Sequence, residues 1–120
     1  MLNCTRIYAD DQGAARFEDI RIPMTPEEPG PETLSVSEVF GASGLIFARA
    51  VAGGGHPDQP EPRRALGIVL AGSSEISASG ETRTFTTGDI LLIEDTEGVG
   101  HSSRTADGFL VALAILDPPR

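Results

Sequence analysis

Imidazole and carboxylate side chains are the groups of this sequence that could do chemistry. The chain has two histidines, His56 and His101, and 18 acidic against 9 basic residues. His56 lies in the segment GGGHPDQPEP, residues 53–62, where glycines and prolines favour a loop. His101 ends the acidic segment EDTEGVGH, residues 94–101. Because ligand-binding residues tend to lie on loops held by a rigid scaffold, these histidines are the first candidates for a functional site.

Several functional classes lack support in the sequence. There is no Ser-His-Asp order, P-loop, G-x-G-x-x-G or C-x-x-C, which leaves nucleotide binding and triad hydrolysis without a motif. The formal charge of −9 would repel a phosphate backbone, so we expect neither nucleic acid nor anionic membrane as a partner.

The expected location is the cytoplasm. Cys4 is the only cysteine, so no intrachain disulfide can form, and a reducing compartment is expected. We interpret Cys4 as a small residue beside the first strand rather than as a nucleophile. The N-terminus lacks the pattern of a signal peptide, and no segment approaches the roughly 18 apolar residues of a membrane span.

The elements that must position the histidines are predicted to be strands. Apolar runs separated by glycines at short, regular spacing are typical of an all-β sandwich or barrel. Residues 65–71 are nearly continuously apolar, which predicts a strand covered on both faces, and residues 90–93 form a second apolar strand. Gly80 can supply the positive φ of a short hairpin turn. Further strands are expected at residues 5–8, 17–22, 35–40, 44–51, 75–78, 82–85 and 109–116, with turns at Gly72 to Ser74 and at Gly88.

The length of 120 residues fits one domain with one core. We therefore predict a single domain, residues 1–120, with N-terminal strands and a Pro-rich loop in residues 1–43 and a barrel core in residues 44–116. The loop at residues 23–31 holds four prolines and cannot be a central strand. Aromatic residues are scarce, so the core must be built largely from aliphatic side chains.

This order of parts resembles the small single-domain cupins, whose fold is a double-stranded β-helix or jelly roll. The resemblance covers roughly residues 45–116. It rests on the stretch A-L-G-I-V-L-A-G, a hairpin with an S-G turn, the corner T-G-D-I-L-L-I and a following G-x-G-H. The resemblance implies an all-β, cupin-type jelly-roll barrel. In that family two motifs supply three histidines and a glutamate, which typically hold a metal in the barrel mouth.

The family's motif positions are only partly filled here. Gly72 matches the glycine that ends the first motif, and Gly88 matches the glycine that opens the second. His101 matches the second motif's histidine, a couple of residues later than usual. Ala65 occupies the glutamate position. Three side chains of ligand type stand nearest to the missing histidine positions: His56, Asp58 and Glu61.

The resemblance therefore implies a metal site of mixed ligands. His56 and His101 would meet at the barrel mouth and be completed by one carboxylate, from Glu61, Asp58 or Glu94. Such a set would suit a divalent transition metal such as Zn, Fe, Mn or Ni. The alternative is that both are ordinary loop histidines and no metal is bound, because two nitrogen ligands fall short of the three that catalytic sites keep.

Arginines and one acidic residue are further site candidates. Arg63 has the strand parity of Ala65, so it could reach a carboxylate or phosphate in the cavity; the alternative is a solvated surface charge. Arg83 and Arg104 are candidates on neighbouring elements. Glu94, at the cavity end of its strand, could act as a ligand or a proton acceptor. Its neighbour, Asp95, should point to the opposite face.

The predicted function is binding of a small anionic or oxygen-rich organic molecule in the barrel. As an enzyme the protein would be an isomerase, lyase or dioxygenase, with His101 as ligand or general base, Arg63 orienting the substrate, and His56 and Glu94 contributing. The competing prediction is a metal-free binding or sensing module. Convergence of His56, His101 and Arg63 on one cavity would favour the enzyme, and a purely apolar cavity would favour binding. We also expect a homodimer, because jelly rolls leave sheet edges that pairing can cover.

Overall fold

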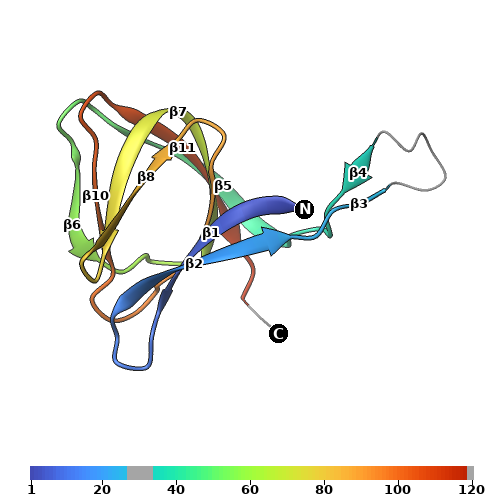
Figure 1. The fold of residues 1–120 in the computed structure, drawn as a ribbon, viewed down its shortest axis with the longest axis horizontal. Coiled ribbons are helices and arrows are strands. Elements are labelled where there is room, and N and C mark those ends of the chain that lie inside the picture. The colour runs from blue at the N-terminus through green and yellow to red at the C-terminus, as the bar shows by residue number, and fades with distance from the viewer. Residues whose placement is uncertain (27–33, 119–120) are drawn as a thin grey trace.

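The computed structural model describes residues 1–26 and 34–118, and within them the chain is built from strands (Figure 1). The described residues accordingly contain no helix long and apolar enough to span a membrane. The predicted Pro-rich loop at residues 23–31 falls largely outside the described part. The strands are β1 (Leu2–Ala9), β2 (Ala15–Ile22), β3 (Thr25–Pro26), β4 (Ser35–Val36), β5 (Ala42–Ala50), β6 (Gly55–Gln59), β7 (Ala65–Ala78), β8 (Glu81–Thr86), β9 (Ile90–Glu94), β10 (His101–Arg104) and β11 (Phe109–Leu116).

Nine of the strands join in one hydrogen-bonded sheet that folds into two layers. The first layer has the order β2-β1-β9-β7-β11-β5, and the second has the order β6-β10-β7-β8. β1 runs parallel to β9, whereas the other neighbours are antiparallel. The small hairpin of β3 and β4 extends away from the barrel (Figure 1). This arrangement confirms the all-β jelly-roll prediction, and it places β1 and β2 in the barrel sheet itself.

β7 serves both layers because it bends at Gly72. Its first half pairs with β9 and β11, and its second half pairs with β8 and β10. Gly72 has a φ of 77°, and a Cβ there would collide with the carbonyl oxygen of Gly108. The prediction of a turn from Gly72 to Ser74 is therefore wrong. Glycine in this conformation, next to a register shift in β11, bends the strand without ending it.

The next turns follow the sequence more closely. β7 and β8 are joined by Ser79 and Gly80, whose φ values of 49° and 85° are those of a two-residue hairpin turn with both residues left-handed. Gly88, with a φ of 92°, makes the corner before β9. The loop predicted at residues 53–62 instead contains β6. That strand tolerates Pro57 because, among the strands of residues 1–26 and 34–118, it pairs with β10 on one edge only.

The core lies between the two layers, but it covers only one side of β7. Ala65 and Val69 are 2% and 1% exposed, whereas Ile68 and Leu70 are 40% and 43% exposed. The prediction that residues 65–71 are covered on both faces is therefore wrong, because nothing in the described part of the chain packs fully over the outer face. The main core cluster consists of Ile7, Val69, Ile76, Phe85, Leu91 and Ile93.

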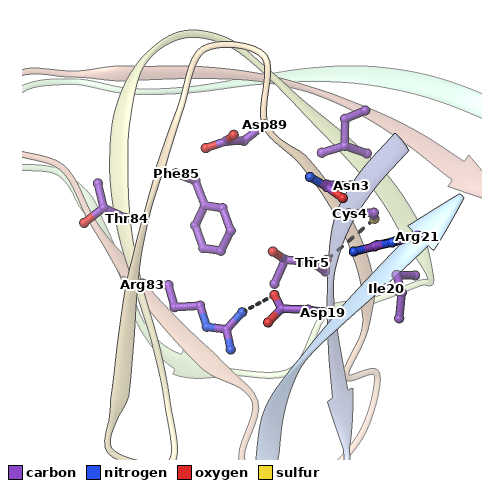
Figure 2. Close-up of a pocket in the computed structure, with 11 residues that line it drawn as sticks. Asn3, Cys4, Thr5, Asp19, Ile20, Arg21, Arg83, Thr84, Phe85 and Asp89 are labelled. Atoms are coloured by element: carbon purple, nitrogen blue, oxygen red, sulfur yellow. Dashed lines mark hydrogen bonds and ion pairs between the residues drawn. The ribbon is translucent and has the colours of Figure 1, made fainter. Parts of the chain in front are cut away.

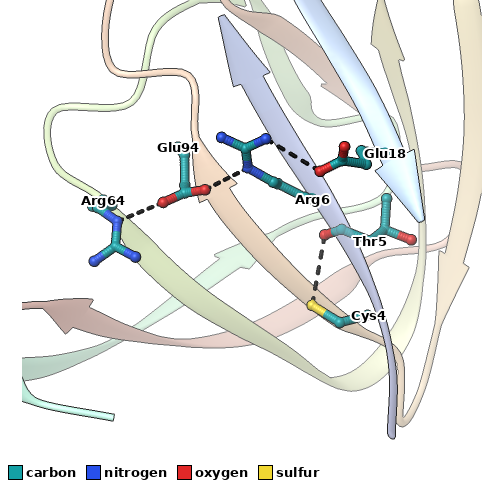
Figure 3. A network of polar contacts seen from close by, with 6 residues as sticks. All are labelled: Cys4, Thr5, Arg6, Glu18, Arg64 and Glu94. Atoms are coloured by element: carbon teal, nitrogen blue, oxygen red, sulfur yellow. Dashed lines mark hydrogen bonds and ion pairs between the residues drawn. The ribbon is translucent and has the colours of Figure 1, made fainter. Parts of the chain in front are cut away.

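A network of ion pairs lies on the outer surface of the first layer (Figure 3). Glu94 accepts hydrogen bonds of 2.6 Å from the Nε atoms of both Arg6 and Arg64, and Arg6 also bonds Glu18 at 3.1 Å. Burial alone would raise the pKa of Glu94, but the hydrogen bonds from Arg64 and Arg6 outweigh it and lower that pKa below 4.5. Glu94 therefore ties β9 to β1 and to the start of β7.

Replacing the glycine at the bend should cost more stability than replacing the glycine of the hairpin turn. Both Gly72 and Gly80 have positive φ, so alanine pays a backbone penalty of about 1–2 kcal/mol at either position. Only at Gly72 would the new Cβ also meet backbone atoms, since nothing lies within 4 Å at Gly80. Urea denaturation should show a clearly larger loss of unfolding free energy for Gly72→Ala than for Gly80→Ala. Equal losses would mean that the backbone at Gly108 moves to accommodate the new Cβ.

Replacing Glu94 by glutamine should destabilise the protein by about 1–2 kcal/mol at neutral pH, because charge-assisted hydrogen bonds to two arginines are weakened. The folded-state pKa is lowered, so this stabilisation is complete above pH 4.5 and is lost as the pH falls through the folded-state value. The difference between wild type and Glu94→Gln in urea denaturation should shrink on acidification. Glu97→Gln, at an exposed loop position, is the control and should change little at any pH.

Candidate functional site

His101 is the central residue of the candidate site. It begins β10, its exposed fraction is 2%, and its Nδ1 lies 2.6 Å from Oδ2 of Asp95. Because a carboxylate oxygen accepts, Nδ1 is the nitrogen that donates to Asp95, and Nε2 is the ring nitrogen directed away from that bond. Nε2 lies 3.5 Å from Oε1 of Glu61. Gly100 permits this approach, because it has a φ of 76° and a Cβ there would collide with the backbone of Gln59 and Pro60.

Asp95 is the functional residue that sequence reasoning passed over. It directly follows β9 and is fully buried, and its carbonyl oxygen accepts a 3.0 Å hydrogen bond from the amide of Glu61. The alternation of inward and outward side chains along β9 predicts the inward direction of Asp95. Asp95 has the inward parity of Leu91 and Ile93, whereas Glu94 has the outward parity. Glu94, the predicted site residue, is the outward member of the acidic pair.

His56 approaches the same place from the edge strand β6, where it pairs with Ser103 of β10. Its Nδ1 lies 2.8 Å from the carbonyl oxygen of Pro57, which can only accept, so this nitrogen also carries a proton. The rings of His56 and His101 meet edge to face with centroids 5.1 Å apart. Both imidazoles therefore keep Nε2 as the nitrogen available to a ligand.

Glu61 supplies the third group of the cluster. Burial is the main effect on its carboxyl group and raises its pKa; His101 opposes this shift, and Asp95 adds to it. One ligand atom from each of His56, Glu61 and His101 lies within 4.8 Å of the others. Two imidazoles and a carboxylate are a donor set suited to divalent transition metals. Among the described residues, these three are the ones that could hold a metal ion together.

The cluster opens on a cavity of about 340 Å³ between the two layers. Its remaining wall is largely apolar, and Ser74, Ser103, Gln59 and Arg49 add polar groups. A cavity of this size accommodates a small organic molecule. The apolar residues that line it are Ala48, Ala50, Ile76, Leu91, Ile93, Phe109, Val111 and Leu113.

The structure brings some of the predicted site residues together and places others elsewhere. His56, His101 and Glu61 converge on the cavity. Arg63 does not line it, because it precedes β7 and is exposed on the outside of the barrel. Glu94 is held on the outer surface by its two arginines. Two other candidates, Asp58 and Arg104, are exposed and lie outside the cluster, whereas Arg49, which was not a candidate, borders the cavity.

Arg83 belongs to a different hollow, between the β1–β2 hairpin and β8 (Figure 2). Its guanidinium bonds Asp19 and Glu81, each at 2.7 Å, and stacks over the ring of Phe17. At about 570 Å³ this hollow is larger than the cavity at His101, but its described residues include no cluster of metal-ligating side chains. Through these contacts Arg83 links β8 to β2.

Comparison with known proteins adds a fold but no activity. No family model matches the chain, and no curated protein matches it. A cupin superfamily protein from Desulfitobacterium hafniense has a similar structure, with a TM-score of 0.51 and 14% identity over 82% of this chain and all of that one. A conserved protein of unknown function from Streptococcus pyogenes matches with a TM-score of 0.50 and 18% identity, over 63% of this chain and 65% of that one. The jelly-roll topology and the match across the whole Desulfitobacterium protein together identify the fold of this chain as the cupin fold.

Proposed function

We propose that this protein binds a divalent transition metal ion through His56, Glu61 and His101, next to a cavity that takes a small oxygen-bearing organic molecule. The observation that carries the proposal is the convergence of these three side chains, within 4.8 Å of one another, on one cavity of a cupin fold. Two nitrogens and one carboxylate meet the minimum of three protein ligands that catalytic metal sites keep, with a further position left for substrate or water.

The hydrogen bonds of the cluster fit metal ligation. Both Nδ1 atoms are engaged, by Asp95 and by the carbonyl of Pro57, so each ring offers Nε2. Tetrahedral ligation with bonds of about 2.0–2.1 Å places neighbouring ligand atoms about 3.4 Å apart. The distance of 3.5 Å between Nε2 of His101 and Oε1 of Glu61 already matches this spacing. His56, on an edge strand, needs only a small adjustment.

Asp95 acts in this proposal as the positioning residue of His101. A buried carboxylate bonded to the far nitrogen of a metal-binding imidazole fixes the ring's orientation and makes its other nitrogen a better ligand. When bound, the metal would polarise a substrate oxygen as a Lewis acid. The aliphatic part of the wall would lower the polarity around a bound substrate. The reaction classes that we propose are isomerisation, elimination and dioxygenation, with no role for Arg63 or Glu94, which lie outside the cavity.

A metal-free binding module is the second candidate function. The aliphatic and aromatic wall of the cavity favours it, because such a surface binds an apolar ligand without any metal. In that case Glu61 and His101 would serve only as hydrogen-bonding groups for the ligand. The purified protein would then contain no metal and take up none in solution. It would still bind a fluorescent apolar probe that other apolar ligands displace, and this result would favour the second candidate.

The proposal extends to location and partner. The single cysteine favours a reducing compartment, and we propose the cytoplasm. We also propose that the functional form is a homodimer.

Metal content tests the proposal directly. Protein purified without a histidine tag should contain, or take up, one equivalent of Zn, Mn, Fe or Ni per chain, as measured by elemental analysis and isothermal titration calorimetry. His101→Ala and Glu61→Gln should each abolish stoichiometric binding, because only two ligands remain in either variant. Asp58→Asn is the matched control, because Asp58 is an exposed carboxylate on β6 outside the cluster, and it should bind as wild type does. Absence of metal from the wild type at saturating ion would overturn the proposal.

Replacing Asp95 by asparagine should weaken metal binding without abolishing it. Loss of the charged partner of a ligating imidazole typically lowers affinity by about 10- to 100-fold. Calorimetric titration of Asp95→Asn should give a dissociation constant raised by that factor, while circular dichroism confirms that the sheet is retained. An unchanged dissociation constant would mean that Asp95 does not position His101 for the metal.

A further inference from the structure

The outer face of the first layer carries a continuous apolar surface. Residues that pair across β9, β7, β11 and β5 point to the same side of a sheet, and here they form two adjacent rows. Alternate residues on the same strands point inward, towards the cavity and the core. The outer face is therefore distinct from the candidate metal site. The two rows, named here the apolar face, are Ile90, Ile68, Ala112 and Phe47, and Leu92, Leu66, Ala114 and Leu45.

The described part of the chain leaves much of the apolar face open. Phe47 is 65% exposed, Leu45 59% and Ile68 40%. Leu70, on the same side of β7, is 43% exposed and extends the face along the strand. Monomeric proteins seldom expose contiguous apolar patches larger than a few hundred Å². Within the described residues β5 pairs with β11 alone, which leaves its other edge open there, and a long apolar edge strand normally needs cover.

The charges around the apolar face indicate which partner covers it. The chain carries a net charge of −9, so two copies repel each other over most orientations. The two rows contain no charged residue, Arg49 follows Phe47 on the same side of β5 at their margin, and the network of Arg6, Arg64, Glu18 and Glu94 beside the rows is neutral in sum. Two copies can therefore meet on this face without bringing unpaired acidic groups together. An apolar, uncharged centre surrounded by a polar rim is the usual composition of a homodimer interface.

We infer that the apolar face is the surface through which two copies of this chain form a symmetric dimer. In such a dimer the apolar face of one copy packs against the apolar face of the other, so the same residues form both halves of the contact. The inference gives the homodimer of the proposed function a specific surface. It does not depend on the metal, because the apolar face and the cavity lie on opposite sides of the first layer.

Light scattering coupled to size-exclusion chromatography tests the inference. Wild-type protein should elute at twice the chain mass of 12.6 kDa, and its mass should fall on dilution. Ile68→Glu and Phe47→Glu should each raise the dimer dissociation constant by at least about 100-fold, because the symmetry buries two carboxylates in an apolar contact. Val99→Glu is the control, because Val99 is 58% exposed in the loop after β9 and lies outside both rows. It should remain dimeric.

The outcomes separate this inference from the metal proposal. Glutamate variants that are monomeric, folded by circular dichroism and still able to bind metal would support the apolar face as the dimer surface, independently of the metal site. A monomeric wild type, a dimer that survives both glutamate substitutions, or a Val99→Glu variant that dissociates equally would overturn the inference. Hydrogen exchange of the wild type gives a reading that needs no variant. Amides of β5 and β7 should exchange faster when the protein is diluted below its dissociation constant, and no change would count against the dimer surface.

Discussion

The shared strand β7 is the constraint on which the rest of the molecule depends. Its first half holds β9, which ends just before Asp95, and its second half holds β10, which begins at His101. Because β7 pairs with both β9 and β10, it helps to hold the two ends of the loop from Asp95 to His101 at the distance of their 2.6 Å bond. Gly72 makes this possible, since it lets the backbone bend between the layers without interrupting the hydrogen bonding.

The candidate site combines a rigid half with an adaptable half. His101 is buried and bonded to a buried carboxyl group, and its orientation is fixed by the packing around it. Within the described part of the chain, His56 lies on a strand with one paired neighbour, and its ring hydrogen-bonds the carbonyl oxygen of Pro57. Such a division suits a site that must close on an incoming ion or molecule. The ordered histidine defines the position, and the less restrained one completes the contact.

The sequence predicts the features that depend on local chemistry. Alternating apolar residues and the glycines of the hairpin identify most strands of the barrel, and the histidines with Glu61 are recognisable as possible ligands. Features that depend on distant pairing are not predictable in this way. Gly72 can bend a strand or end it, and only its pairing with β11 decides which. Counting alternate residues back from Ala65 predicts that Arg63 faces the cavity. The strand begins only at Ala65, so this alternation does not determine the direction of the Arg63 side chain. Asp95 was missed because an acidic residue after a strand is usually solvated.

The Oδ1 atom of Asp95 has a consequence for how this protein could evolve. It is buried and has no hydrogen-bond partner among the described residues, whereas Oδ2 is bonded to His101. An unsatisfied buried acceptor costs on the order of 1–3 kcal/mol, which selection for folding alone would remove. Replacing Asp95 by an apolar residue would remove this cost but leave the buried Nδ1 of His101 without its acceptor, so the two positions can change without loss of stability only together.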